Sequence, residues 1–124
     1  MKLRLRENSI RLRLLQSEVN QLQENRIVSE EINFGGGQIL TYTLKVSDDA
    51  EQISACFAND EVCLKIPFAA ARNWAETMLV SLEYEQRIDK NSTLKILIEK
   101  DFVCLDRPFD ADNADAFPHP KIEC

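Results

Sequence analysis

The chain has 124 residues, is 44% hydrophobic, and carries a formal net charge of −6. These values predict one globular domain. No apolar run approaches the roughly 20 residues of a membrane span, and the charged start lacks the apolar stretch of a secretory signal. An acidic chain is also poorly suited to nucleic acid, whose binding rests on neutralised phosphates. We expect a cytoplasmic protein with no membrane or nucleic-acid partner.

The first predicted element is a hairpin with strands over 2–6 and 10–15, joined by a two-residue loop. Apolar and polar residues alternate along both strands, which is the period of a sheet with two different faces. Leu5 is expected opposite Ile10, because a one-residue slip would set leucines against arginines. The polar face is basic and consists of Lys2, Arg4, Arg6, Arg11 and Arg13.

A short helix and a second hairpin follow. Ser17 is a favourable N-cap for a helix over 17–25. Strands are predicted over 26–34 and 38–47, and the turn between them is Gly35–Gly37, since glycine tolerates positive φ.

The same order of elements is predicted once more after residue 51. Strands are expected over 52–58 and 61–66, a helix over 68–76, and strands over 77–86 and 93–100. In the earlier of these two hairpins Phe57 should face Val62. In the later one, a plausible register pairs Leu82 with Ile96.

An internal repeat underlies this order. With an offset of 52, Ile10, Leu12 and Leu14 align with Val62, Leu64 and Ile66, and the offset becomes 54 after one loop. The halves are about 1–47 and 52–101 of a single domain over 1–105. The predicted class is α+β: two β-β-α-β-β halves that bury their apolar faces as an eight-stranded antiparallel barrel or sandwich, with the short helices plugging its ends.

The tail over 106–124 is acidic and contains prolines. Pro118 and Pro120 exclude regular structure around them. Phe109 and Phe117 are expected to pin the tail to the domain.

The basic face is the most unusual local feature of the chain. Arginine side chains match phosphate and carboxylate groups, so Arg4, Arg6, Arg11 and Arg13 are candidate ligand-binding residues. The alternatives are a solvated sheet face or arginines paired with the protein's own acidic tail.

Two further groups of residues can carry chemistry. Cys56 and Cys63 should lie opposite each other in a hairpin, as reduced thiols rather than a disulfide or half of a zinc site. Glu83 and Glu85 share one side of a strand, as a magnesium site requires, although pairing of Glu83 with Lys95 on a solvated face explains them too.

The opening Lys2–Arg6, the stretch 36–42 (Gly-Gly-Gln-x-Leu-x-Tyr) and the Phe-Pro-x-Pro at 117–120 resemble a small bacterial family of unknown function. This resemblance covers most of the chain. It implies a cytoplasmic protein of about this length and carries over no activity and no site residues.

A second resemblance is architectural. Duplicated halves with charges alternating along strands are similar to the triphosphate-tunnel (CYTH-type) phosphatases. That resemblance implies phosphate contacts from Arg4, Arg6, Arg11, Arg13 and Lys65. It also implies a metal held by Glu83 and Glu85. The family's Glu-x-Glu-x-Lys run in the first strand is replaced here by Lys-x-Arg-x-Arg, which argues against catalysis.

The sequence therefore favours a non-enzymatic binding or accessory module that uses the basic face and needs no cofactor. Its partner would be a small anion or another protein, and a homodimer is compatible with the chain. The alternative is a magnesium-dependent phosphohydrolase. Charged side chains that point into a tunnel would favour the enzyme, and side chains that point outward would favour the binding module.

Overall fold

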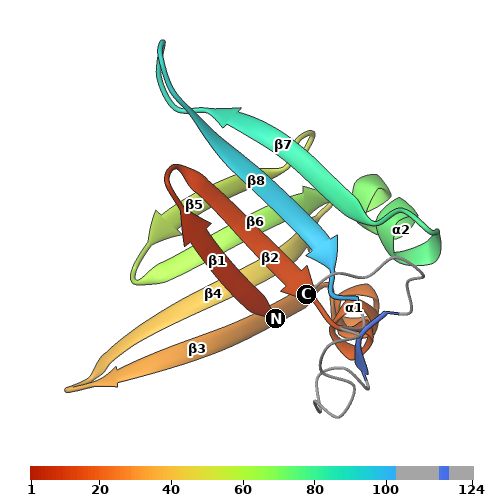
Figure 1. Cartoon of the computed structure of the whole chain (residues 1–124), viewed down its shortest axis with the longest axis horizontal. Coiled ribbons are helices and arrows are strands. Elements are labelled where there is room, and N and C mark those ends of the chain that lie inside the picture. The colour runs from red at the N-terminus through yellow and green to blue at the C-terminus, as the bar shows by residue number, and fades with distance from the viewer. Residues whose placement is uncertain (103–114, 118–124) are drawn as a thin grey trace.

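The computed structural model describes residues 1–102 and 115–117 (Figure 1). In this part of the chain, the order strand, strand, helix, strand, strand occurs twice. The elements are β1 (Lys2–Arg6), β2 (Ser9–Leu14), α1 (Gln16–Asn25), β3 (Ile27–Gly35), β4 (Gln38–Ser47), β5 (Ser54–Ala58), β6 (Glu61–Pro67), α2 (Phe68–Glu76), β7 (Ser81–Arg87) and β8 (Thr93–Lys100). The predicted α+β class is confirmed.

The strands form two four-stranded sheets, and each sheet takes one hairpin from each half of the chain. Sheet A has the order β1-β2-β8-β7 and sheet B the order β3-β4-β6-β5. The hairpins are antiparallel, but the central pairs β2–β8 and β4–β6 are parallel. The prediction of a wholly antiparallel arrangement is therefore wrong. Alternation assigns a face to each strand, but it does not say in which direction a distant strand will run beside it.

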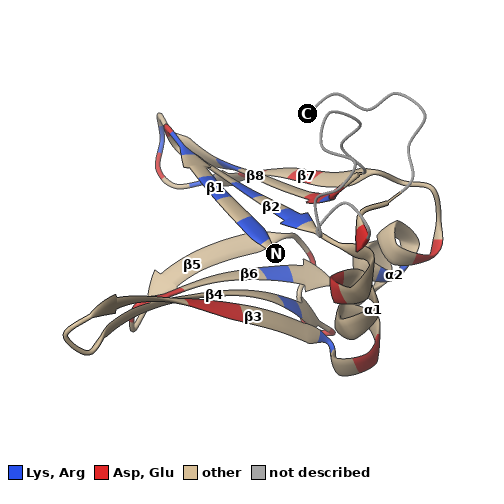
Figure 2. Ribbon diagram, turned by 60° about the horizontal axis from the view of Figure 1, so that its bottom comes forward, with Lys and Arg blue, Asp and Glu red and all other residues tan. Residues whose placement is uncertain are grey.

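The two sheets face each other as layers of a sandwich, and they are not closed into a barrel (Figure 2). Both helices lie at the same end of the sandwich and contact each other, so the expectation of helices at its two ends is wrong. The chain connectivity explains this placement. α1 follows β2 after one residue and α2 follows β6 directly, so both helices lie where these central strands finish.

The core lies between the sheets and against the helices. From the strands it takes the fully buried Leu12, Leu14, Leu44, Leu64, Ile66, Ile96 and Ile98. The helices add Val19, Leu22, Ala71 and Trp74. Trp74 is 0% exposed, and its Nε1–H donates to the Val80 carbonyl at 3.0 Å. Burial of each large apolar side chain contributes about 1.5–3 kcal/mol, so the apolar faces meet inside and the charged faces point outward.

The registers of the two short-loop hairpins are confirmed. Leu5 lies opposite Ile10, and Phe57 lies opposite Val62. The second of these turns places Asn59 and Asp60 at φ 53° and 61°, the left-handed backbone that a two-residue hairpin of this type requires.

The predicted register of the last hairpin is wrong by two residues. Leu82 pairs with Ile98 rather than Ile96, and Lys95 pairs with Glu85 rather than Glu83. A shift of two residues keeps every side chain on its face, so the apolar pattern cannot detect it. The loop sets the register: Asp89 Oδ1 accepts from the Asn91 amide at 2.8 Å and from the Ser92 hydroxyl at 2.9 Å.

Helix α1 begins earlier than predicted, with Leu15 at the N-cap position. Glu18 Oε1 accepts a hydrogen bond from the Leu15 amide at 2.9 Å. A side chain of the first helical turn thus pairs with the backbone N–H of the N-cap residue. Ser17 is not the cap. It lies in the first turn, where its amide donates to Asp115 Oδ1 at 3.1 Å.

The described tail residues pack on the body, as predicted for Phe117. Its amide donates to the Asp101 carbonyl at 2.8 Å, and its ring meets Phe102 edge-on at 6.1 Å between centroids. Phe109 lies outside the described residues.

The described helices α1 and α2 are too short and too polar for either to span a membrane.

Candidate functional site

The basic face lies on the outside of sheet A. On the opposite face of these strands, Leu12 and Leu14 of β2 belong to the core, and Leu3 of β1 packs against it. The arginines therefore point away from the space between the sheets. Blue segments of the ribbon in Figure 2 mark the lysine and arginine positions along β1 and β2.

An open hollow of about 640 Å³ lies on this face. Three arginines of β1 and β2 contribute to one side of it, and two carboxylates of β7 contribute to the other. Its charged lining residues are Arg4, Arg6, Arg11, Lys95, Glu83 and Glu85. Leu97 also lines it and is the β8 partner of both Arg11 and Glu83. An apolar side chain therefore separates the cationic wall from the acidic one.

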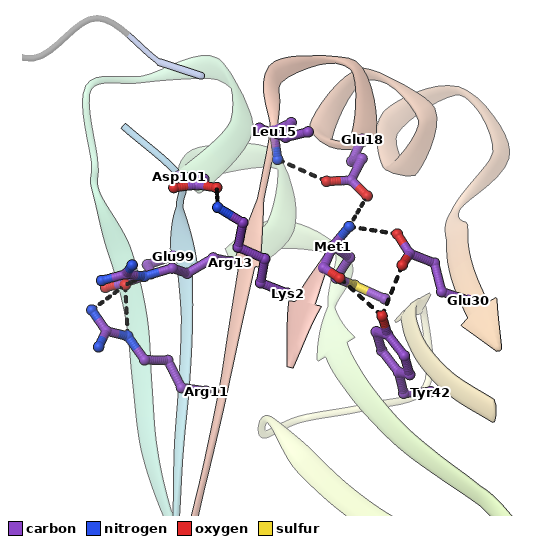
Figure 3. A network of polar contacts seen from close by, with 10 residues as sticks. All are labelled: Met1, Lys2, Arg11, Arg13, Leu15, Glu18, Glu30, Tyr42, Glu99 and Asp101. Atoms are coloured by element: carbon purple, nitrogen blue, oxygen red, sulfur yellow. Dashed lines mark hydrogen bonds and ion pairs between the residues drawn. The ribbon is translucent and has the colours of Figure 1, made fainter. Parts of the chain in front are cut away.

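Part of the basic face is already neutralised by the protein itself. Arg11 Nε and Arg13 Nε both donate to Glu99 Oε1, at 2.7 and 2.6 Å (Figure 3). Glu99 is only 13% exposed, so this carboxylate is well placed to hold two guanidinium groups. Lys2 forms an ion pair with Asp101 at 3.0 Å.

The other two arginines differ in this respect. No ion pair joins Arg4 or Arg6 to any residue in the described part of the chain, and both side chains are exposed. Arg4 is also the direct cross-strand partner of Arg11, and like charges placed opposite each other are destabilising. An anion bound in the hollow would relieve this repulsion.

Of the residues predicted from the sequence, the structure brings Arg4, Arg6 and Arg11 together with Glu83 and Glu85 in one hollow. Arg13 does not line the hollow. Lys65 does not join it either, because β6 belongs to sheet B.

Sequence analysis did not place three residues beside the arginines: Lys95, Leu97 and Glu99. All three lie on the outer face of β8, beside β2. The alternation along β8 was visible in the sequence, but the parallel pairing that brings β8 next to the arginines was not.

A second polar cluster joins the start of β1 to sheet B, and we call Met1, Glu18, Glu30 and Tyr42 the charged seam. The Met1 ammonium is buried and forms ion pairs with Glu18 and Glu30 (Figure 3). The Tyr42 hydroxyl lies 2.8 Å from Glu30 Oε2 and 3.0 Å from the Met1 carbonyl oxygen, and its single proton can serve either acceptor. Each ionisable group of this seam therefore already has a partner in the described part of the chain.

The charges of this seam titrate abnormally. Burial lowers the pKa of the Met1 ammonium, but its hydrogen bonds to Glu18 and Glu30 outweigh burial, so the pKa is raised above 8.0. Burial raises the pKa of Glu18. The pKa of Glu30 is lowered, because burial is outweighed by hydrogen bonds from Met1 and Tyr42. Burial, followed by the bond to Glu30, raises the pKa of Tyr42 to about 12.

Cys56 and Cys63 are direct cross-strand partners, as predicted, and both are free thiols. Burial, followed by the neighbouring Cys56 and Glu61, raises the pKa of the Cys63 thiol, which lowers its thiolate fraction. No group of three or more His, Cys, Asp or Glu side chains within residues 1–102 and 115–117 could hold a metal ion. Cys104, His119 and Cys124 lie outside the described residues.

A smaller hollow of about 300 Å³ lies between α1 and α2. The charged residues at its rim already have partners. Arg26 Nη2 lies 2.6 Å from Asp48 Oδ1, and the Arg26 guanidinium carbon Cζ lies 5.3 Å from the centre of the Phe68 ring. Arg72 pairs with Glu76 at 3.0 Å. The hollow on sheet A is therefore the better candidate for a charged ligand.

Comparison with known proteins gives one match. The model of a family of unknown function (DUF7009) matches residues 1–121. No curated protein and no solved structure matches the chain significantly.

Proposed function

The chain belongs to this family of unknown function, and we propose that the protein is a non-enzymatic binding module whose basic face receives an anionic group. One observation carries the proposal. Arg4 and Arg6 border a hollow and have no ion-pair partner among the described residues, whereas Arg11 and Arg13 share Glu99.

The chemistry of the hollow narrows the kind of ligand. Guanidinium groups bind phosphate or carboxylate through paired hydrogen bonds. Glu83 and Glu85 on the opposite wall repel a second anionic group, and Leu97 between the walls offers an apolar contact. A suitable ligand therefore carries its negative charge at one end and an apolar body beside it.

An Arg4→Gln/Arg6→Gln variant tests this proposal. Tripolyphosphate, ATP, citrate and sulfate would each be titrated while the unfolding midpoint is followed, since a ligand of the folded state raises it. Charge-assisted hydrogen bonds are worth about 1.5–3 kcal/mol each, so the loss of two arginines should weaken binding more than about tenfold. The matched control is Lys45→Gln/Lys65→Gln, which removes two charges from sheet B. Equal shifts in both variants would refute the proposal.

A second candidate function is the magnesium-dependent phosphohydrolase. It is favoured by the position of Glu83 and Glu85, which line the same hollow as the arginines. The outward direction of these side chains favours the binding module instead. The titration is repeated with Mg²⁺ while released phosphate is measured. Phosphate release that is lost in Glu83→Gln/Glu85→Gln would establish the enzyme, and binding without Mg²⁺ dependence or release would support the module.

The cellular context remains a prediction. Free thiols at Cys56 and Cys63 fit a reducing compartment such as the cytoplasm. The partner is predicted to be a small anion or a protein, without nucleic acid and without a membrane, and a homodimer remains compatible with the chain.

A further inference from the structure

The free edge of β1 is a second feature of the basic face. In the described part of the chain, β1 has a strand neighbour only on its β2 side. A two-residue turn connects Arg6 to its partner Ser9, which makes this a hydrogen-bonded pair. Arg6 and Arg4 therefore direct their backbone N–H and C=O groups toward β2. Leu5 and Leu3 occupy the alternate pairs and direct their N–H and C=O groups outward. Such an edge is a template for another strand.

The other half of the chain covers the corresponding edge. We call Gln86 and Ala55 the amide seam. The Ala55 amide donates to Gln86 Oε1 at 2.7 Å, and Gln86 Nε2 donates to the Ala55 carbonyl at 3.0 Å. The side chain of Gln86 thus satisfies both outward backbone groups of an edge-strand residue, as a neighbouring strand would.

In the described part of the chain, no side chain covers Leu3 or Leu5 in this way, and the charged seam reaches only the Met1 carbonyl. The strand registers match Ala55 with Leu3, which lie opposite Leu64 and Leu12, and match Gln86 with Ile32, which lie opposite Leu94 and Leu40. Isoleucine has no amide group, so it cannot bond to the backbone of β1. Ile32 is itself 41% exposed, and Leu5 is 61% exposed. Among the described residues, the β1 edge therefore offers outward backbone groups without a partner, beside the exposed apolar side chain of Leu5.

The charges beside this edge restrict what can bind there. Arg4 and Arg6 lie on the outer face of β1 without ion-pair partners among the described residues, and Leu5 lies on its inner face. A strand added next to β1 would place alternate side chains on these two faces. Acidic residues would meet the arginines, and apolar residues would cover Leu5. A basic strand would be repelled by the arginines, and a uniformly polar strand would leave Leu5 uncovered.

From this geometry we propose that β1 is a strand-addition site for an extended protein segment in which acidic and apolar residues alternate. The inference deepens the proposed function and rests on it: the anionic groups that the basic face receives are the acidic side chains of this segment. Backbone hydrogen bonds to Leu3 and Leu5 supply affinity, and the arginines supply selectivity.

The test uses three short fluorescent peptides. One alternates glutamate and valine, the second has the same composition with the two residues in separate blocks, and the third alternates lysine and valine. We expect the alternating acidic peptide to bind the full chain at least about tenfold more tightly than either control. On binding, hydrogen exchange of the Leu3 and Leu5 amides should slow, because these donors become paired.

A Leu5→Pro variant separates strand addition from anion binding. Proline removes the outward N–H of Leu5 and leaves the β1–β2 hydrogen bonds in place, which is why it is tolerated on edge strands. This variant should lose peptide binding about tenfold and keep its response to tripolyphosphate. Arg4→Gln/Arg6→Gln should lose both. Phe57→Pro, at the corresponding outward position of β5, is the matched control and should bind the peptide normally.

Several results would overturn the inference. They are equal binding of the block peptide, unchanged exchange of the Leu3 and Leu5 amides, or an oligomer dependent on Leu5, which would make a second copy of the chain the occupant. The exchange measurement needs no substitution, so it decides the matter even if Leu5→Pro fails to fold. Tripolyphosphate that fails to bind while the alternating peptide succeeds would refute free-anion binding and leave strand addition intact.

Discussion

The charged seam and the amide seam join the two sheets at opposite edges of the sandwich by different chemistry. At one edge the Met1 ammonium lies between two carboxylates, with Tyr42 bonded to Glu30 and to the Met1 carbonyl. At the other, one neutral amide of Gln86 bonds the Ala55 backbone twice.

This difference means that the two edges should respond differently to pH. Every polar side chain or terminus of the charged seam can gain or lose a proton, whereas an amide cannot in the ordinary range. Both seams thus connect sheet A to sheet B, one through ionisable groups and the other through a neutral amide, and a pH series can distinguish them.

The largest loss should follow truncation of Trp74, the largest fully buried side chain of the described residues. Trp74 is 0% exposed and holds the Val80 carbonyl just before β7. Trp74→Ala should lower the free energy of unfolding by about 3–5 kcal/mol, because it leaves a large cavity. Urea titration measures this loss. Met78, which is 94% exposed, is the control, and Met78→Ala should change little. Similar losses at both positions would contradict the packing described.

The charged seam should weaken in alkali. The pKa of Tyr42 is raised to about 12 in the folded protein, from the ordinary tyrosine value of 10.0 that applies to the unfolded chain. A raised pKa stabilises the fold fully below the unfolded value and loses that contribution as pH rises through the folded value. Stability from Tyr42 should therefore fall by about 2 kcal/mol between pH 10 and pH 12. The Met1 ammonium, whose pKa is raised above 8.0, should begin the decline earlier.

Tyr42→Phe tests this directly. The variant should lose stability at pH 7 and show a flatter decline from pH 10 to pH 12, as followed by urea titration at each pH. Tyr84→Phe serves as the matched control on sheet A. An unchanged pH profile in Tyr42→Phe would show that the hydroxyl does not couple the sheets.

The amide seam should give a smaller loss that does not depend on pH. Gln86→Leu keeps the size of the side chain but removes both hydrogen bonds to Ala55. The free energy of unfolding should fall by about 1–2 kcal/mol, to a similar extent at pH 6 and pH 9. A loss that grows with pH would indicate that the amide seam is coupled to titrating groups, which would weaken the comparison.

The smallest effect should arise at the hairpin tips. Glu7 has φ 50° and Asn59, its counterpart at an offset of 52, has φ 53°. Asparagine visits the left-handed region more readily than glutamate does. Glu7→Asn should therefore raise the free energy of unfolding by up to about 1 kcal/mol, which urea titration would show as a slightly higher unfolding midpoint. Asn59→Glu should lower stability by a similar amount. A gain in both variants would show that side-chain contacts, and not φ, dominate at the tips.

Some residues of the candidate site could be predicted from the sequence and others could not. The common face of Arg4, Arg6 and Arg11 follows from alternation along two adjacent strands, so the sequence predicted it. Lys95 and Leu97 enter the site only because β8 runs beside β2. Lys65 was grouped with the arginines by resemblance, and it lies in the other sheet.

Local patterns in the sequence specify the hairpins, the short helices and the inward-facing side chains, because these features depend on neighbours within a few residues. The parallel central pairs, the two-residue shift that places Leu82 opposite Ile98, and the two seams follow from tertiary contacts alone. The parallel pairs and the seams join residues that are distant in sequence. The two-residue shift leaves every apolar side chain on the same face of the sheet. Local patterning is equally satisfied by several such arrangements, and long-range packing and hydrogen bonding select among them.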